Sequence, residues 1–427
     1  MDTDNHIYID GPINAFRLEG QVNGIKKMIY LFEDHPHTID QQTKCGTYDS
    51  VAVSNYIYKK CKEINQTNIT YDLFGEIYAS DYYNTSINNN TTVRYIDNYM
   101  MMLRTMKYQK NQENMFENIR IHYTDPREYL YHDIINIEYE ILDQIDDGQC
   151  PEYAHSIFER INDIKEIIAL HQNIIIIIRT TNMTHYIEYI KKNLQVLYNQ
   201  RTNKNIYRNQ SYDTAQINDD MHFDQIINAY ITRMIKKKDA NALKKILAAL
   251  LFFDKLLNRF NNDLIKKLIV DKLAFLCLDK LNDLIECSDH LINRLKNIIK
   301  VNSDKNTNSL CAKFKDEFYI MKSKSLYVYA IIMDMYVLKR FLDKDYIERG
   351  ILYSGYAHTS NIIYCLIHHM EFKITHVAKN NKKYTIDIIN KKIKNNTFTF
   401  IADIIDLLLD PNDLQCIDMF YFPENLK

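Results

Sequence analysis

Several residue types that carry strong structural signals are rare or absent in this chain of 427 residues. Tryptophan is absent, and there are only 8 glycines and 6 prolines. Glycine is too scarce for the phosphate-binding loop G-x-x-x-x-G-K-[ST], and no such loop occurs. Purely apolar runs, such as residues 174–178, are all far shorter than the ~20 residues of a membrane span. The sequence therefore predicts neither a P-loop nucleotide site nor a membrane helix.

Cysteine is present but not in a pattern that indicates covalent or metal cross-links. The eight cysteines are scattered, and no C-x-x-C pair occurs. A disulfide framework is normally denser and belongs to a smaller secreted chain. The N-terminus is acidic and polar and shows no secretory signal. We therefore expect a soluble protein in a reducing compartment, and we interpret Cys45 and Cys365 as buried thiols.

The chain also has no large excess of basic or of acidic residues. The chain has 53 basic and 55 acidic side chains, which gives a net charge of −2. Such a balance provides no specific signal for nucleic acid or for an anionic membrane surface. With 46% hydrophobic residues the chain can bury sizeable cores, and its length allows two or three domains.

The order of the elements predicts an α/β fold. Apolar segments typical of strands alternate with segments of helical spacing along the first 150 residues, which favours parallel pairing with right-handed crossovers. A further strand is predicted at Gly350–Ser354. We expect a mainly parallel central sheet built from residues 1–150 and 321–427, with a mostly helical insertion at residues 151–320. Within this insertion Ile174–Arg179 could be a strand or part of a helix, and five consecutive isoleucines favour a strand.

The most suggestive stretch is Met28–Cys45. An apolar run ends abruptly in Glu33, Asp34, His35, Pro36 and His37. Ligands of α/β proteins bind at the carboxyl ends of the strands. If strand Gly350–Ser354 is a neighbour, His358 reaches the same edge. Imidazole and carboxylate groups suit a divalent metal, so we name Asp34, His35, His37 and His358 as candidate metal ligands.

A metal-free acid–base site is the alternative. Its candidate catalytic residues are Glu33, Glu76, His122, Asp125 and Arg127, which follow or end predicted strands. Arg127 could orient an anionic group through two hydrogen bonds, or it could simply pair with Asp125 to close a turn. No H-x-x-x-H or H-E-x-x-H helix supports a metal centre. The sequence leaves the metal site, the acid–base site and a structural role open.

Three segments resemble a family of uncharacterised proteins of giant, mimivirus-like DNA viruses of amoebae. They are YLFEDHPHTIDQQTKC (residues 30–45), IRIHYTDPR (119–127) and the region 332–358 with its Asp-x-Tyr helix and Tyr-x-Gly-x-x-His strand end. This resemblance implies a viral protein in the virion or in the virus factory of the host cytoplasm, with other viral proteins as partners.

The Gly355-Tyr356-Ala357-His358 motif is similar, at a greater distance, to the G-x-x-H strand ends of erythromycin-esterase-like and Tiki-type hydrolases. That resemblance implies a hydrolase, metal-dependent in some members. The first such motif departs from the pattern, because Glu33 stands where glycine is expected. We therefore favour a non-catalytic or degenerate α/β scaffold, with a metal-dependent or acid–base hydrolase as the alternative.

Overall fold

The protein divides into two compact units. A computed structural model describes residues 7–35, 45, 50–75, 94–113, 115–124, 126, 130–146, 150–180, 184–202, 225–300, 307–378, 384–395, 404, 407–408, 415–420 and 422–423. Met1–Asp125 and Tyr336–Lys427 form an α/β unit, and Pro126–Met335 form a helical unit. The second boundary falls inside a long helix, α11 (Thr307–Leu342).

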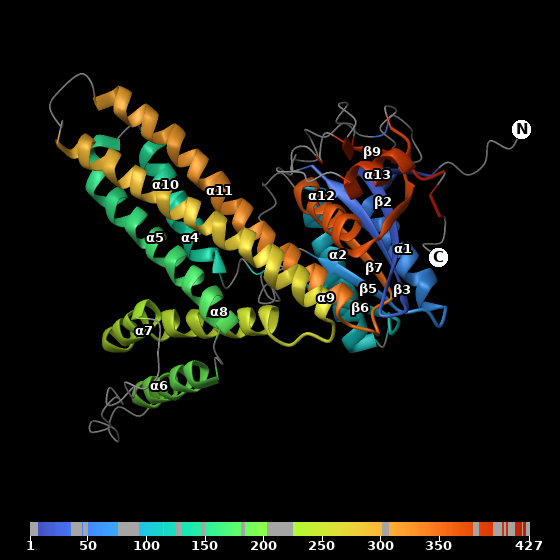
Figure 1. Cartoon of the computed structure of the whole chain (residues 1–427), viewed down its shortest axis with the longest axis horizontal. Helices are drawn as coiled ribbons and strands as arrows, with labels where there is room; N and C mark the ends of the chain where they lie inside the picture. The colour runs from blue at the N-terminus through green and yellow to red at the C-terminus, as the bar shows by residue number, and fades with distance from the viewer. Residues whose placement is uncertain are drawn as a thin grey trace, which may run out of the picture. The chain divides into compact units, whose positions relative to one another are not determined.

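The α/β unit contains a six-stranded sheet with the order β6-β5-β7-β3-β2-β8 (Figure 1). The strands are β2 (Pro12–Val22), β3 (Ile25–Asp34), β5 (Tyr71–Gly75), β6 (Ile119–Tyr123), β7 (Arg349–Gly355) and β8 (Lys373–Val377). Strands β6, β5, β7 and β3 are parallel, whereas β2 pairs antiparallel with both β3 and β8. The prediction of an α/β fold is confirmed, and the expected parallel arrangement holds for four strands of this sheet.

The antiparallel pair arises from a tight hairpin between β2 and β3. Asn23 and Gly24 lie at its tip with φ of 52° and 81°. A two-residue hairpin turn of this kind needs positive φ at both positions, which Asn-Gly tolerates best. This turn sends β3 back beside β2 before the first crossover helix.

A second, three-stranded sheet lies in the same unit. Its order is β4-β1-β9, with β1 at Tyr8–Asp10, β4 at Val51–Ala52 and β9 at Cys416–Asp418. Strand β1 pairs parallel with β4 and antiparallel with β9. This small sheet therefore brings the first and last described strands of the chain together.

Helices cover both faces of the six-stranded sheet. On one face, α1 (Val53–Asn65) and α2 (Tyr95–Glu113) share a buried apolar cluster with β3, β5 and β7. On the other face, Phe341 from the end of α11 packs edge-on against Phe74 of β5, and α12 (Tyr356–Tyr364) contacts β3 and β7. Burial of apolar surface on both faces explains why β3 and β7 read as nearly continuous hydrophobic runs.

The helical unit is built around long helices. It contains α4 (His132–Asp146), α5 (Cys150–Thr180), α6 (Thr184–Thr202), α7 (Gln225–Lys237), α8 (Ala240–Leu257), α9 (Asp263–Lys266), η1 (Lys267–Leu273), α10 (Ala274–Lys300) and most of α11. Helices α5, α10 and α11 run side by side (Figure 1). Among the described residues, no helix has the length and apolar character needed to cross a bilayer.

The strand favoured for Ile174–Arg179 is wrong, because this segment continues α5. Ile174, Ile175 and Ile178 are buried, whereas Ile176 is 43% exposed. That pattern follows a helical period, and packing of α5 against α10 outweighs the preference of isoleucine for strands. The local sequence of this segment is compatible with a strand or a helix, and its tertiary contacts determine that it is helical.

Candidate functional site

The carboxyl ends of β3 and β7 lie side by side. The two strands pair in parallel, with Glu33 opposite Ser354 and Asp34 opposite Gly355. The sequence predicted that these two strand ends, some three hundred residues apart, would be neighbours, and this is confirmed. The side chains that the strands bring to this edge nevertheless point to different faces, because successive residues of a strand alternate.

Asp34 is a structural carboxylate in this fold. It is 2% exposed, and the Tyr353 hydroxyl donates a hydrogen bond of 2.7 Å to its Oδ1. The Gln415 amide donates to the same oxygen over 3.3 Å and to the carbonyl of His35 over 3.2 Å. These bonds fasten the segment before β9 to the end of β3. Asp34 therefore holds the C-terminal part of the chain in place.

Glu33 points to the opposite face and is fully buried, with an exposed fraction of 0%. Within the part of the chain that the structure describes, neither carboxyl oxygen has a hydrogen-bond partner. Burial raises the pKa of Glu33 well above its ordinary value, because the charged form would lose its hydration. Burial therefore favours the protonated acid over the carboxylate at this position.

Glu33→Gln is expected to flatten the pH dependence of the unit's stability. The folded protein binds this proton more tightly than the unfolded chain does, since the folded-state pKa is raised. The resulting stability is fully present below the unfolded pKa and is lost as pH rises through the folded pKa. Chemical denaturation between about pH 4 and about pH 9 measures the effect. Equal pH slopes for the wild type and Glu33→Gln would contradict it, and Glu63→Gln on α1 is the control.

The predicted metal ligands do not form a ligand set in the described part of the chain. His35 stacks on Tyr356 at the start of α12, with ring centroids 5.5 Å apart, and His358 lies in the first turn of that helix. His37 and Glu76 fall outside the described residues, as do Asp125 and Arg127. Over the described ranges, no three His, Cys, Asp or Glu side chains are grouped to hold a metal.

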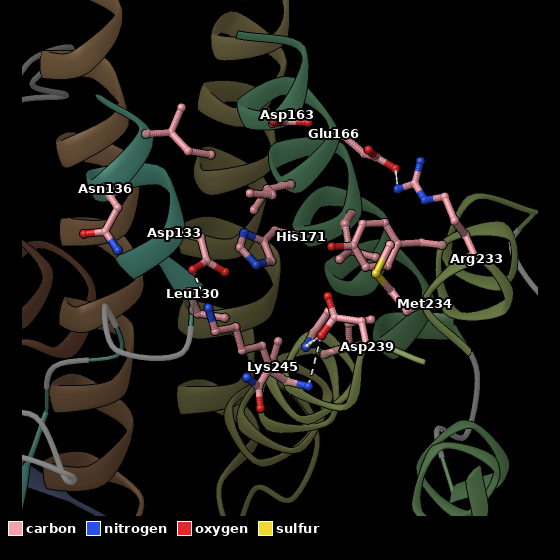
Figure 2. Close-up of a pocket in the computed structure, with 18 of the residues that line it drawn as sticks. Leu130, Asp133, Asn136, Asp163, Glu166, His171, Arg233, Met234, Asp239 and Lys245 are labelled. Atoms are coloured by element: carbon pink, nitrogen blue, oxygen red, sulfur yellow. Dashed lines mark hydrogen bonds and ion pairs between the residues drawn. The ribbon is translucent and has the colours of Figure 1, made fainter. Parts of the chain in front are cut away.

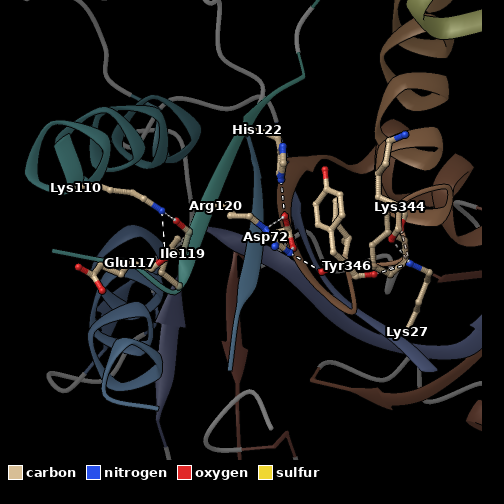
Figure 3. A network of polar contacts seen from close by, with 11 residues as sticks. Lys27, Asp72, Lys110, Glu117, Ile119, Arg120, His122, Lys344 and Tyr346 are labelled. Carbon is tan, nitrogen blue, oxygen red and sulfur yellow. Dashed lines mark hydrogen bonds and ion pairs between the residues drawn. The ribbon is translucent and has the colours of Figure 1, made fainter. Parts of the chain in front are cut away.

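His122 takes part in a different cluster, with Asp72 and Arg120 (Figure 3). Its Nε2 lies 2.6 Å from Asp72 Oδ1, and the ring stacks on Phe74. Arg120 binds both oxygens of Asp72 at 2.8 Å and 2.5 Å and also donates to the carbonyl of Tyr346. Asp72 is fully buried, and both of its carboxyl oxygens are bound by side chains of the neighbouring strand β6.

A buried lysine lies at the amino end of β3. Lys27 donates three hydrogen bonds, to the carbonyls of Phe341, Lys344 and Ile347 at 3.1, 2.9 and 2.5 Å. These carbonyls belong to the last turn of α11 and the loop that follows, where helices leave acceptors unsatisfied. Burial lowers the pKa of Lys27 to about 8. Lys27 thus joins the two chain segments that form the sheet.

Sequence reasoning missed Asp72, Arg120 and Lys27 as polar centres. A signal was present, because each is a charged residue next to apolar residues of a strand. The sequence does not show which residues of the two strands lie opposite each other. In the structure Asp72 lies opposite Arg120, and Phe74 lies opposite His122, so all four side chains share one face.

Cys45 forms a disulfide with Cys416, although the sequence favoured a buried thiol at this position. The two cysteines are 371 residues apart in sequence, and their Cα atoms are 5.0 Å apart. They meet because β1 pairs with β9, and the Cys45 amide donates to Asp10 at the end of β1. Spacing along the chain could not reveal this pair. Cys365 is a buried thiol, as expected.

Comparison with known proteins identifies several relatives of this chain. A family model described as "Family of unknown function (DUF5847)" matches residues 7–427. Three proteins of Acanthamoeba polyphaga mimivirus are similar over nearly their full lengths. "Uncharacterized protein R161" is 27% identical and covers 99% of both chains. "Uncharacterized protein R160" is 27% identical over 98% of this chain and 96% of its own. "Uncharacterized protein R706" is 26% identical over 99% and 98%.

No solved structure matches the chain. The expected kinship with a giant-virus family is confirmed, whereas no finding supports a likeness to erythromycin-esterase-like or Tiki-type hydrolases. Because the family model spans almost every residue, this chain belongs to the family of unknown function DUF5847, which has several members in that giant virus.

Proposed function

We propose that this protein is a non-catalytic α/β scaffold that acts in the virion or the virus factory, with other viral proteins as its partners. One observation carries the proposal. Asp34, the acid expected to bind a metal, is 2% exposed and is occupied by Tyr353 and Gln415. Because the Asp34 carboxylate is buried and hydrogen-bonded to these two residues, a substrate cannot reach it. Glu33, its neighbour, is buried on the other face.

Metal analysis tests this proposal directly. A scaffold is expected to purify with less than one equivalent of zinc, iron or manganese, and chelator is expected to leave its melting temperature unchanged. Structural metal sites contribute folding free energy, so their removal would destabilise the protein. One equivalent of bound metal, together with a fall of several degrees in chelator, would contradict the proposal. A buffer sample taken through the same purification controls for adventitious metal.

The place of action needs a separate measurement. Quantitative mass spectrometry of purified virions and of isolated virus factories is expected to find the protein enriched in one of them over the soluble host fraction. An even distribution over all fractions would argue against a scaffold of either assembly.

A second candidate function is a hydrolase, and the contact of His122 with Asp72 is the observation that favours it. A carboxylate 2.6 Å from an imidazole can orient the ring for acid–base chemistry. This branch predicts hydrolysis of a p-nitrophenyl ester that His122→Gln abolishes and His132→Gln, an exposed change on α4, preserves. Ester hydrolysis that survives His122→Gln would contradict the hydrolase function.

A further inference from the structure

The helical unit contains a cavity of 640 Å³ that is separate from the strand ends. Helices α4, α5, α7 and α8 line it (Figure 2). This volume lies within the range of about 300–1,000 Å³ that is usual for small-molecule sites. Part of its lining is apolar: Leu130, Ile137, Ile167, Leu170, Met234 and Ile246. The cavity thus combines an apolar wall with charged groups around it.

The acidic side chains of the lining all have partners. Asp133 binds Lys245, and Glu166 binds Arg233. Arg160 contacts Glu140 at 2.9 Å and Asp163 at 3.7 Å. Asp239 caps α8 by accepting from the amides of Asn241 and Ala242. Each acidic side chain of the lining is therefore already paired with a cation or with helix amides of the protein itself.

Lys237 and His171 are two basic side chains of the lining that make no ion pair with a described acid. Lys237, at the exposed end of α7, lines the cavity and has no acidic partner among the described residues. His171 of α5 is 4% exposed and extends into the space beside Asp133, as Figure 2 shows. Burial lowers the pKa of His171 to about 4, so its ring is neutral at pH 7.

The position of the proton on His171 follows from Tyr329. The Tyr329 hydroxyl is buried and lies 2.9 Å from Nδ1, its hydrogen-bond partner in the described part of the chain. A buried hydroxyl donor requires an acceptor, so Tyr329 donates to Nδ1. The proton of the neutral ring is then on Nε2. Because Tyr329 does not line the cavity and His171 does, Nε2–H is the edge that faces it.

We propose that this cavity binds a small organic anion, a carboxylate or phosphate on an apolar body, through His171 Nε2–H and Lys237. The apolar wall receives the body of the ligand, and His171 Nε2–H and Lys237 receive the anionic group. A cationic ligand would have to displace an ion pair that the protein already makes. This inference concerns the helical unit and does not depend on the proposed scaffold function.

Two aromatic anions and one cation test the proposal by isothermal titration of the full-length protein. Benzoate and phenyl phosphate serve as carboxylate and phosphate probes, and benzamidine is a cation of similar size. At least one anion is expected to bind saturably with a dissociation constant below about 1 mM. Stronger binding of the carboxylate or of the phosphate probe identifies the anionic group. The absence of saturable anion binding, or stronger binding of benzamidine, would overturn the proposal.

Two neighbouring lysines provide a matched pair of variants. Lys236 and Lys237 are both exposed in the last turn of α7, but only Lys237 lines the cavity. Lys237→Gln is expected to weaken anion binding about five-fold, and Lys236→Gln less than two-fold, as suits a partly screened charge. Equal effects of the two changes would show non-specific attraction and contradict the assigned site.

His171→Gln tests the inner donor, with circular dichroism as the check that the helices remain folded. Anion affinity is expected to fall about ten-fold, because the ligand loses a buried hydrogen bond. Unchanged affinity in a folded His171→Gln protein would remove His171 from the site. If this variant does not fold, the comparison of Lys237→Gln with Lys236→Gln still decides the proposal.

Discussion

Replacing Asp72 by alanine is expected to lower the free energy of unfolding of the α/β unit by about 3–5 kcal/mol. Asp72 is fully buried, and it accepts from Arg120 through both oxygens and contacts His122 at 2.6 Å. Without the carboxylate, the largely buried guanidinium and imidazole lose their acceptor, and an unpaired buried charge is costly. In a unit of this size the change corresponds to a fall in melting temperature of roughly 10 °C.

Urea denaturation followed by circular dichroism measures this change. Glu63→Ala is the matched control, because the Lys60–Glu63 ion pair lies on α1 with Glu63 43% exposed. Lys60 is buried but its partner Glu63 reaches solvent, so this pair is expected to contribute about 1 kcal/mol or less. Asp72→Asn keeps an acceptor oxygen and is expected to fall between the two variants. If Asp72→Ala and Glu63→Ala cost the same, the cluster on β5 and β6 is not a stability determinant.

Removing the Cys45–Cys416 disulfide is expected to destabilise the α/β unit by about 2–5 kcal/mol. The bond closes a loop of 371 residues, so the oxidised chain has fewer unfolded conformations available than the reduced one. The disulfide also holds β9 near β1 and supports Gln415, which binds Asp34. Reduction is therefore expected to loosen the C-terminal segment first.

Denaturation of the oxidised wild type, the reduced wild type and Cys45→Ser tests this expectation. Cys311→Ser is the control, because Cys311 is a free cysteine in the helical unit. Reductant should lower the stability of the wild type and leave that of Cys45→Ser unchanged. A wild type that unfolds at the same denaturant concentration with and without reductant would show that the bond contributes nothing measurable.

Local sequence patterns predicted much of the α/β unit. Strand β7 and its place beside β3 were both expected and are found, and the Asn23-Gly24 turn is of a kind that local sequence encodes. These features depend on short-range chemistry: positive φ at Asn-Gly, and apolar runs long enough to cross a buried sheet. The Ile174–Arg179 segment failed because its β-branched residues suit a strand locally, whereas the helix partners that bury them lie far away in sequence.

The meeting of two strand ends was predictable from the sequence, whereas the hydrogen-bond partners of their side chains were not. Sequence placed Glu33, Asp34 and His358 near one sheet edge, and the structure brings the ends of β3 and β7 together there. The sequence could not reveal that Asp34 is bound by Tyr353 and Gln415, since those residues come from the other end of the chain. It also could not pair His122 with Asp72, because that contact depends on strand register.

The sequence by itself determined the fold class, the lack of a P-loop and the kinship with a giant-virus family, because composition, periodicity and short motifs are properties of neighbouring residues. Only the tertiary structure decided the partners of the buried charges, the Cys45–Cys416 disulfide and the cavity around His171. Each of these depends on groups separated by about fifty to nearly four hundred residues, and burial sets their chemistry by removing water. No spacing along the chain encodes such contacts.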